Sequence, residues 1–343
     1  MILIKKVIRV LVVDDSVFFR EALRYHISRE PGMEIAGEAA DAATAVKRIE
    51  ELNSDVITLD IEMPGMNGID FLKKVMPGYA IPVVVVSSAN KKVFDALGAG
   101  ALDFVVKPDR ESMGQTLFFN ELKVKLKIAV TANRSILKKM NNPYGERSLN
   151  KHPQYGVIAI GASTGGTEAI FRVIQDLPAN IPGIVIVQHM PPVFTRMYAE
   201  RLNNSCAFEA KEAKSGDRVY PGRLLVAPGE YQMRLKKAGD GYYVECNKEA
   251  KVSGHCPSVD VLFQSVAEKA KGDAIGILLT GMGKDGAEGL LEMRKKGART
   301  FGQDEATSVV YGMPKVAYDI GAVEKQLPLQ DISKELLKIL GIL

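Results

Sequence analysis

The chain has 343 residues, of which 46% are hydrophobic and 25% are charged. This length and composition are typical of a soluble globular protein with two domains, and they exclude disordered, collagen-like and disulfide-scaffold chains. The net charge of +4 comes from one middle segment: residues 111–152 carry a net +5, whereas residues 1–110 carry a net −2 and residues 153–343 a net +1. Because neither flanking block is basic, the charge argues against a nucleic-acid partner.

The first block alternates short apolar runs with amphipathic helical patterns. The expected strands are Val7–Val13, Met33–Glu38, Asp55–Leu59, Ile81–Val86 and Leu102–Val106. The expected helices are Ser16–Glu30, Ala42–Leu52, Gly68–Val75, Lys91–Leu97 and Thr116–Thr131. Apolar runs without strict alternation suit strands buried on both faces of a parallel sheet. Residues 1–131 are therefore predicted to form a doubly wound α/β domain of the flavodoxin-like kind.

A polar, basic stretch without apolar periodicity follows at residues 132–152 and is predicted to be a linker. The α/β pattern resumes in residues 153–343. Strands are expected over Gly156–Gly161, Ile184–Gln188, Ala274–Thr280 and Arg299–Gln303. Helices are expected over Gly166–Gln175, Phe194–Asn203, Ser258–Lys271 and Gly286–Lys296. The prediction is a second, Rossmann-like parallel-sheet domain with an inserted antiparallel hairpin, Tyr231–Lys237 with Tyr242–Cys246.

The cysteines and the N-terminal residues bear on where the protein works. Cys206, Cys246 and Cys256 form no CxxC pair and cannot all be paired within the chain, which is typical of a reduced compartment. The apolar residues near the N-terminus are interrupted by basic side chains, and no run reaches the roughly 20 apolar residues that a membrane span needs. We therefore expect a cytoplasmic protein without membrane insertion.

Polar side chains stand at the ends of four strands of the first block. Asp14 and Asp15 follow the first run, Asp60 ends the third, and Ser87 and Lys107 end the fourth and fifth. Carboxyl ends of neighbouring parallel strands meet at one edge of a sheet, so these residues are expected to lie together. Three carboxylates would repel one another without a cation, and an all-oxygen site suits Mg²⁺. The alternative is that each residue only caps the helix that follows it.

Four strings of the first block resemble a response-regulator receiver domain: VLVVDDS at 10–16, TLDIEMPGMNGIDFL at 58–72, VVVVSS at 83–88 and GALDFVVKP at 100–108. The resemblance implies that Asp60 accepts a phosphoryl group from a histidine kinase. It also implies that Asp15 and Asp60 bind Mg²⁺ directly, with Asp14 behind water and the Glu62 carbonyl completing the site. The remaining residues implied are the switch pair Ser87 and Phe104, and Lys107 as a contact to the phosphoryl group.

In the second block, GASTGG at 161–166 lies between a predicted strand and a predicted helix. The G-x-S-x-G pattern places Ser163 on a tight turn with its hydroxyl exposed at the sheet edge. A glycine-rich turn of this kind equally suits phosphate or dinucleotide binding, and the motif alone favours phosphate.

Two further residues at the same edge favour a nucleophile instead. His189 directly follows the next strand, where it can act as a general base, although a lone histidine is more often packed or solvated. Asp285 ends the loop after the strand Ala274–Thr280, where a carboxylate can orient an imidazole. Its simplest alternative role is to cap the following helix. The chain order Ser–His–Asp differs from that of α/β-hydrolases, but triads are defined by geometry.

Several strings spread over residues 155–320 resemble the catalytic domain of the chemotaxis protein-glutamate methylesterases. They are GASTGG at 161–166, VQHMP at 187–191, VAPG at 226–229, PSVDVLF at 257–263, LTGMGKDG at 279–286 and YGMP at 311–314. The resemblance implies Ser163 as nucleophile, His189 as general base and then acid, and Asp285 as its orienting partner. It places the backbone N–H of Met282, together with Thr164, at the oxyanion, and puts His255 near the site without a chemical role.

The implied reaction is hydrolysis of glutamate γ-methyl esters on chemoreceptors, with release of methanol and without a cofactor for the hydrolysis. Deamidation of receptor glutamines is a second activity that the resemblance raises. The chemoreceptors would be the substrate and a chemotaxis histidine kinase the phosphoryl donor. Activity is expected to rise on phosphorylation of Asp60, because the unphosphorylated receiver would block the active-site edge.

Two other functions are alternatives to the esterase. A DNA-binding response regulator would carry a basic recognition helix in the second block, which is nearly neutral. A nucleotide-binding domain would place an acidic ribose contact at the end of the strand after the glycine-rich turn. That place holds Gln188 and His189, so the sequence disfavours both alternatives.

Overall fold

The computed structural model describes residues 7–88, 92–108, 115–132, 155–239 and 241–343. The chain divides into two compact units, Met1–Met140 and Asn141–Leu343. The linker predicted at 132–152 lies outside the described residues apart from Ala132, so its bounds stay a prediction. In the part of the chain that the structure describes, no helix combines the length and apolarity that crossing a bilayer requires.

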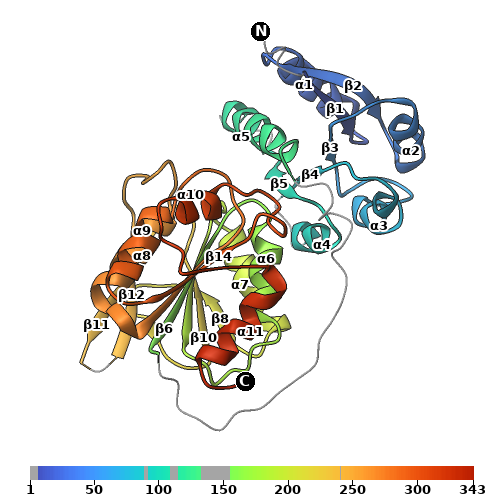
Figure 1. Cartoon of the computed structure of the whole chain (residues 1–343). Coiled ribbons are helices and arrows are strands. Elements are labelled where there is room, and N and C mark those ends of the chain that lie inside the picture. The colour runs from blue at the N-terminus through green and yellow to red at the C-terminus, as the bar shows by residue number, and fades with distance from the viewer. Residues whose placement is uncertain (1–6, 89–91, 109–114, 133–154, 240) are drawn as a thin grey trace. The chain divides into compact units, whose positions relative to one another are not determined.

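The first unit is a five-stranded parallel sheet with the strand order β2-β1-β3-β4-β5 (Figure 1). Its strands are β1 (Ile8–Val13), β2 (Met33–Ala39), β3 (Val56–Leu59), β4 (Val83–Ser87) and β5 (Asp103–Val106). Its helices are α1 (Val17–Ser28), α2 (Ala42–Glu51), α3 (Gly68–Lys74), α4 (Lys92–Gly98) and α5 (Gln115–Ala129). Strands β3 and β4 are buried along their whole length, as expected for strands covered on both faces.

The second unit is built on a seven-stranded parallel sheet with the order β15-β14-β13-β6-β7-β10-β8. Its strands are β6 (Val157–Ala162), β7 (Gly183–Gln188), β8 (Glu209–Glu212), β10 (Arg223–Val226), β13 (Ala274–Leu278), β14 (Arg299–Gln303) and β15 (Lys325–Leu327). A separate antiparallel sheet contains β9 (Arg218–Val219), β11 (Gln232–Ala238) and β12 (Gly241–Asn247).

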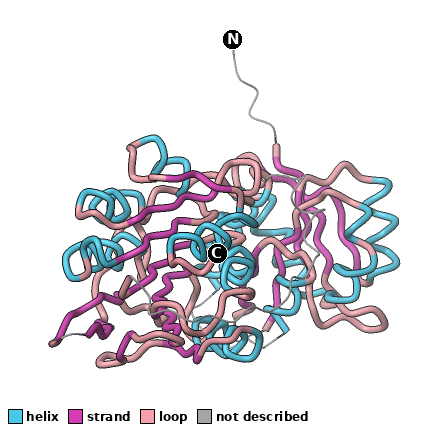
Figure 2. Tube along the Cα trace, turned by 60° about the horizontal axis from the view of Figure 1, so that its bottom comes forward, coloured by secondary structure: helices cyan, strands magenta, loops and turns pink. Residues whose placement is uncertain are grey.

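Helices cover both faces of this sheet. Figure 1 shows α8, α9 and α10 on one side and α6, α7 and α11 on the other, and in Figure 2 the strands of each unit lie between helices. The helices are α6 (Gly166–Ile174), α7 (Phe194–Ser205), α8 (Val259–Lys269), α9 (Ala287–Lys295), α10 (Met313–Asp319) and α11 (Leu329–Ile339). A core of buried apolar side chains joins α8 and α9 to the sheet and to β11 and β12.

The predicted fold class is confirmed: both units are doubly wound parallel-sheet α/β folds, and the hairpin β11–β12 is present. Every helix and strand that was predicted is found within two residues of its expected ends. The elements that were not predicted are β8, β9, β10, β15, α10 and α11. Strands β8 and β15 lie at the sheet edges and carry mostly polar residues, so they lack the apolar signature of the central strands.

In each sheet, the strand order reverses direction beside the first strand of the unit. The first unit proceeds from β1 to β2 on one side and to β3, β4 and β5 on the other. The second proceeds from β6 to β7, β10 and β8 on one side and to β13, β14 and β15 on the other. Ligands of such folds bind outside the carboxyl ends of the strands at this reversal. A ligand site is therefore expected at the residues that follow β1 and β3 in the first unit, and at those that follow β6, β7 and β13 in the second.

Candidate active site

The acidic residues predicted to meet in the first unit do so. Carboxylate oxygens of Asp14, Asp15 and Asp60 lie within 4.8 Å of one another. Lys107 Nζ lies 2.8 Å from Asp14 Oδ2 and 2.6 Å from Asp60 Oδ2. Burial raises the pKa of Asp14, although the hydrogen bond and charge of Lys107 act in the opposite direction. One ammonium group thus pairs with two of the three carboxylates, those of Asp14 and Asp60.

This oxygen-rich donor set fits Mg²⁺, which prefers carboxylate ligands and retains several waters. Arg20 steadies the cluster from behind, because its guanidinium donates to the carbonyl oxygens of Asp14 (2.6 Å) and Asp15 (3.1 Å). The backbone N–H of Glu62 donates to Asp60 Oδ1 at 3.2 Å, which places the Glu62 peptide next to the site. Whether the Glu62 carbonyl is a ligand stays a prediction.

The predicted switch residues lie on the neighbouring strands. Ser87 ends β4, is 1% exposed, and its hydroxyl has no hydrogen-bond partner within the described residues. Its carbonyl accepts a hydrogen bond from the Lys107 N–H at 2.9 Å. Phe104 on β5 is buried and packs edge-on against Phe94 of α4. An unpaired buried hydroxyl is suited to a later acceptor such as a phosphoryl oxygen, and the switch roles stay predictions.

In the second unit, Ser163 stands on the turn between β6 and α6. Its N–H donates to the Thr280 carbonyl (3.0 Å) and its carbonyl accepts from the Gly166 N–H (2.7 Å). Gly281 packs against this turn so closely that a Cβ there would lie 2.7 Å from Ser163 Cβ. Gly165 has φ +76°, a conformation that favours glycine. The turn around Ser163 therefore needs glycine in two of the motifs, Gly165 in GASTGG and Gly281 in LTGMGKDG.

His189 lies beside Ser163 because of the strand register. Ala162 of β6 pairs with Gln188 of β7, and the next residue along each strand is Ser163 and His189. The His189 N–H donates to the Ala162 carbonyl (3.2 Å), and Gln188 Nε2 donates to the Ser163 carbonyl (2.9 Å). Two adjacent strands therefore deliver the serine and the histidine to the same place.

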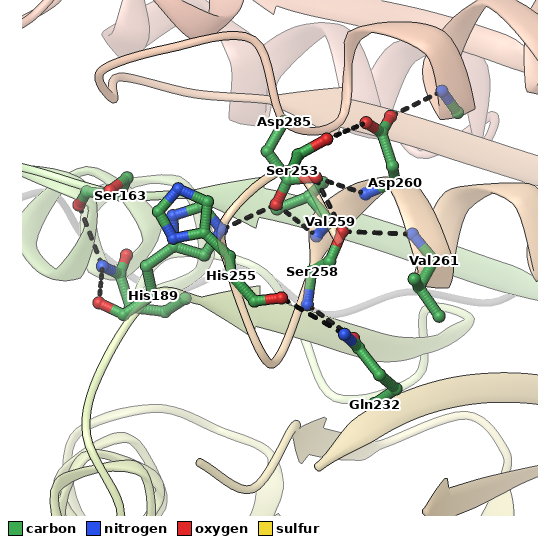
Figure 3. A network of polar contacts seen from close by, with 12 residues as sticks. Ser163, His189, Gln232, Ser253, His255, Ser258, Val259, Asp260, Val261 and Asp285 are labelled. Atoms are coloured by element: carbon green, nitrogen blue, oxygen red, sulfur yellow. Dashed lines mark hydrogen bonds and ion pairs between the residues drawn. The ribbon is translucent and has the colours of Figure 1, made fainter. Parts of the chain in front are cut away.

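The imidazole of His189 is oriented by Asp285. Its Nε2 lies 2.8 Å from Asp285 Oδ2, and the ring lies between Ser163 and Asp285 in the view of Figure 3. A carboxylate accepts only, so Nε2 carries the proton and Nδ1 is the basic nitrogen. Among the described residues, buried Nδ1 has no hydrogen-bond partner, and so none joins it to Ser163 Oγ. Such catalytic hydrogen bonds often form only when substrate is bound.

Asp285 is held by the N-terminus of α8 (Figure 3). Its carboxylate accepts from Ser258 Oγ (2.7 Å), from the Val259 N–H (2.8 Å) and from the Asp260 N–H (3.1 Å). Burial acts to raise the pKa of Asp285, but the hydrogen bonds and the charge of His189 outweigh it and leave the pKa lowered. The alternative in which Asp285 caps its own helix is wrong, because α9 begins after Gly286 without a side-chain cap.

His255 covers the other face of the His189 ring. The two imidazoles are stacked, with centroids 3.7 Å apart and planes 7° from parallel. Burial, followed by the neighbouring His189, lowers the pKa of His255 to about 4. His255 is therefore neutral at neutral pH, and it adds no charge next to the His189 ring.

The two residues predicted at the oxyanion lie near Ser163. Thr164 is the next residue, is buried, and its carbonyl accepts from Thr280 Oγ1 at 3.0 Å. Met282 follows Gly281, the residue packed against Ser163, and 48% of Met282 is exposed. Their roles, like those of Ser163, His189 and Asp285, stay predictions that this arrangement supports.

A family model described as CheB methylesterase matches residues 158–336, and one described as response regulator receiver domain matches residues 10–117. The "Protein-glutamate methylesterase/protein-glutamine glutaminase 2" of Syntrophomonas wolfei is 55% identical and covers 97% of this chain and 98% of its own. The chain belongs to the CheB methylesterase family.

Other members and a solved domain agree with this assignment. The "Protein-glutamate methylesterase/protein-glutamine glutaminase" of Syntrophotalea carbinolica is 48% identical and covers 98% of this chain and 98% of its own. The crystal structure of the Thermotoga maritima CheB methylesterase catalytic domain is 36% identical, with a TM-score of 0.53, and covers 54% of this chain and 98% of that chain. The match to this domain accounts for the second unit of the fold.

Sequence reasoning missed the residues that support the His189–Asp285 pair. Ser258 carries the usual signal of a helix N-cap, but its hydrogen bond to Asp285 spans 27 residues. Gln232 begins β11, and no local pattern marks it, because its partners lie between residues 250 and 258. The PSVDVLF motif had no assigned role, and the structure shows that it forms the cradle of Asp285.

Proposed function

We propose that the chain hydrolyses glutamate γ-methyl esters on chemoreceptors and releases methanol, with Ser163 as the nucleophile. The observation that carries this proposal is the meeting of Ser163, His189 and Asp285 at the carboxyl ends of β6, β7 and β13. A buried carboxylate, an imidazole with one basic nitrogen and an adjacent serine are the parts that acyl transfer requires. Several curated relatives carry the name glutaminase as well, and the same machinery can attack the amide of glutamine.

In the proposed reaction, His189 Nδ1 takes the Ser163 proton as Oγ attacks the ester carbonyl. The tetrahedral intermediate is stabilised by N–H donors near Met282 and Thr164, and loss of one such donor typically costs about 3–4 kcal/mol. His189 then gives its proton to the departing methoxide, which leaves as methanol. Water, activated by the same nitrogen, hydrolyses the acyl-enzyme and restores Ser163. Asp285 stabilises the imidazolium at each stage.

We expect a serine-directed fluorophosphonate probe to label the wild-type chain at Ser163 and to leave Ser163→Ala unlabelled, because Ser163 follows β6 beside His189, whose Nδ1 is basic. Labelling is measured by mass spectrometry of the intact chain and of its peptides. Ser253→Ala, which removes an exposed serine from a nearby loop, should label like wild type. Equal labelling of Ser163→Ala and wild type would contradict the proposed nucleophile.

The first unit is proposed to regulate this activity through phosphorylation of Asp60, with a chemotaxis histidine kinase as the phosphoryl donor. Asp14, Asp15 and Asp60 would hold Mg²⁺, which when bound supplies the positive charge that a phosphoryl group needs to approach these carboxylates. Lys107, already 2.6 Å from Asp60, can pair with a phosphoryl oxygen. A cytoplasmic location, where kinase and receptor tails are accessible, belongs to the same proposal.

We expect phosphoramidate with Mg²⁺ to increase methanol release from methylated receptor by the wild-type chain and to leave the rate of Asp60→Asn unchanged. The amide cannot form the acyl phosphate and binds Mg²⁺ less well than a carboxylate. Asp70→Asn, a change at a half-buried position on α3 of the same unit, should respond like wild type. If wild type showed the same rate with and without phosphoramidate, the regulatory proposal would be wrong while the esterase proposal stood.

A further inference from the structure

One fully buried side chain that takes no part in the proposed reaction contacts two residues that hold the His189–Asp285 pair. These are Ser258, which binds Asp285, and His255, which stacks on His189. Gln232, the first residue of β11, is 0% exposed. Its Oε1 accepts one hydrogen bond and its Nε2 donates two, so the donors and acceptors around it fix the orientation of the amide. Figure 3 shows Gln232 beneath the group that contains Ser258, His255 and Asp285.

The first branch from Gln232 leads to Asp285. Gln232 Oε1 accepts from the Ser258 N–H at 2.8 Å, and Ser258 Oγ donates to Asp285 Oδ1 at 2.7 Å. Ser258 is also 0% exposed, so neither bond competes with water. Gln232 therefore sets the place of the residue that begins α8 and, through it, the direction of the carboxylate.

The second branch leads to the opposite side of the pair. Gln232 Nε2 donates to the carbonyl oxygens of His255 (3.2 Å) and Ala250 (3.1 Å). The loop between them is closed by a backbone bridge in which Val252 and His255 exchange two hydrogen bonds of 2.9 Å. Since the His255 ring is stacked on His189, the same amide also fixes the surface against which the catalytic imidazole lies.

These two branches restrict different motions of His189. The hydrogen bond to Asp285 fixes the position of Nε2, but it leaves the ring free to turn about the Nε2···Oδ2 line. The parallel stack on His255 opposes that turn. Catalytic groups must be held within about 0.5 Å and 10–20° of their working geometry, so both restraints are needed to aim Nδ1 at Ser163.

We propose that Gln232 is a positioning residue for the hydrolysis. Its amide connects Ser258, which holds Asp285, to His255, which holds the His189 ring. The inference rests on the proposed function for its kinetic consequence, whereas its geometric part does not. It also gives the inserted hairpin a role, since β11 supplies this amide from outside the main sheet.

The test compares two full-length variants that each remove a buried polar contact between β11 and α8 or its N-cap. Gln232→Met keeps the volume and removes the amide. Ser265→Ala is the matched control, because Ser265 Oγ accepts from the Leu235 N–H at 2.8 Å at the same interface without reaching the pair. We expect Gln232→Met to lower kcat for release of methanol from methylated receptor by about 10- to 100-fold with KM little changed. Ser265→Ala should retain near wild-type kcat.

A second readout does not depend on esterase activity. The chain has four histidines, so selective ¹⁵N labelling of histidine gives a simple imidazole spectrum. The ring signals of His189 and His255 should shift in Gln232→Met and stay in place in Ser265→Ala, and those of His26 should stay in place in both. If Gln232→Met fails to fold, Gln232→Glu replaces it, because it keeps the acceptor for Ser258 and loses both donors to the His255 loop.

Each outcome decides one question. If kcat and the two ring signals match those of Ser265→Ala, the positioning role is wrong, although the proposed esterase function stands. If wild type releases no methanol, the esterase proposal fails and the ring signals alone decide whether Gln232 orients the pair. Shifted ring signals together with a lowered kcat at unchanged KM would support both.

Discussion

Replacing His189 by alanine is expected to lower kcat for methyl ester hydrolysis by about 10⁶-fold, comparable to the loss of the nucleophile itself. The reason lies in the geometry of the ring: Nε2 is bound to Asp285, and Nδ1 is the unpartnered basic nitrogen next to Ser163 among the described residues. Without it, the serine hydroxyl keeps its proton at neutral pH and attacks poorly. The measurement is methanol release from methylated receptor, with phosphoramidate and Mg²⁺ present.

The matched control is His26→Ala. His26 on α1 is also stacked on an aromatic ring, that of Phe119, with centroids 3.6 Å apart, but it belongs to the first unit. Its loss should change kcat little. Thermal unfolding of both variants shows whether each retains its fold. A folded His189→Ala variant with a rate within tenfold of wild type would rule out His189 as the general base.

Changing Asp285 to asparagine is expected to lower kcat by about 10⁴-fold without unfolding the chain. The Asp285 carboxylate accepts four hydrogen bonds, two at each oxygen, and every partner is a donor. An asparagine must place its NH₂ group against one pair of these donors. If it faces His189 and Val259, Nε2 must become an acceptor, and the imidazole then carries its proton on Nδ1. That tautomer cannot accept the Ser163 proton.

Placed the other way, the NH₂ group would oppose the Ser258 hydroxyl and the Asp260 N–H, and the loss of negative charge would still remove the stabilisation of the imidazolium. Asp273→Asn is the matched control, since Asp273 accepts from the Tyr242 hydroxyl at 2.8 Å in the same unit. It should retain near wild-type kcat. Rates that fall equally in both variants would show that loss of charge in the unit, and not orientation of His189, is responsible.

Much of the fold could be predicted because its central strands are short, apolar and buried on both faces. Runs such as the one at Val83–Ser87 leave little ambiguity, and their carboxyl ends locate the polar residues that gather there. The edge strands β8 and β15 were not predicted, because one side of each strand has no neighbour and their sequences are polar, as in loops. Helices α10 and α11 lie beyond the last predicted strand; the YGMP motif covers the start of α10, but it was assigned no secondary structure.

The candidate site was predictable to a similar extent: its strand-end residues could be predicted, and the residues that hold them could not. Ser163, His189 and Asp285 each follow a strand, so the parallel sheet alone brings them to one edge. What supports them was not predictable, because Gln232 and Ser258 contact residues far away in sequence through single side-chain bonds. Only the packing of β11 beneath the start of α8 creates those contacts, and no local sequence pattern predicts that packing.

The attachment of α8 to Asp285 has a consequence for local unfolding. The first turn of a helix ordinarily frays, and its amides exchange with solvent early. Here the Val259 and Asp260 amides donate hydrogen bonds to the buried Asp285 carboxylate, so this turn cannot open without releasing Asp285. Fraying of the helix and loss of the Asp285 position are thus one event, and the stability of that single turn limits the fraction of molecules in which the His189–Asp285 pair is assembled.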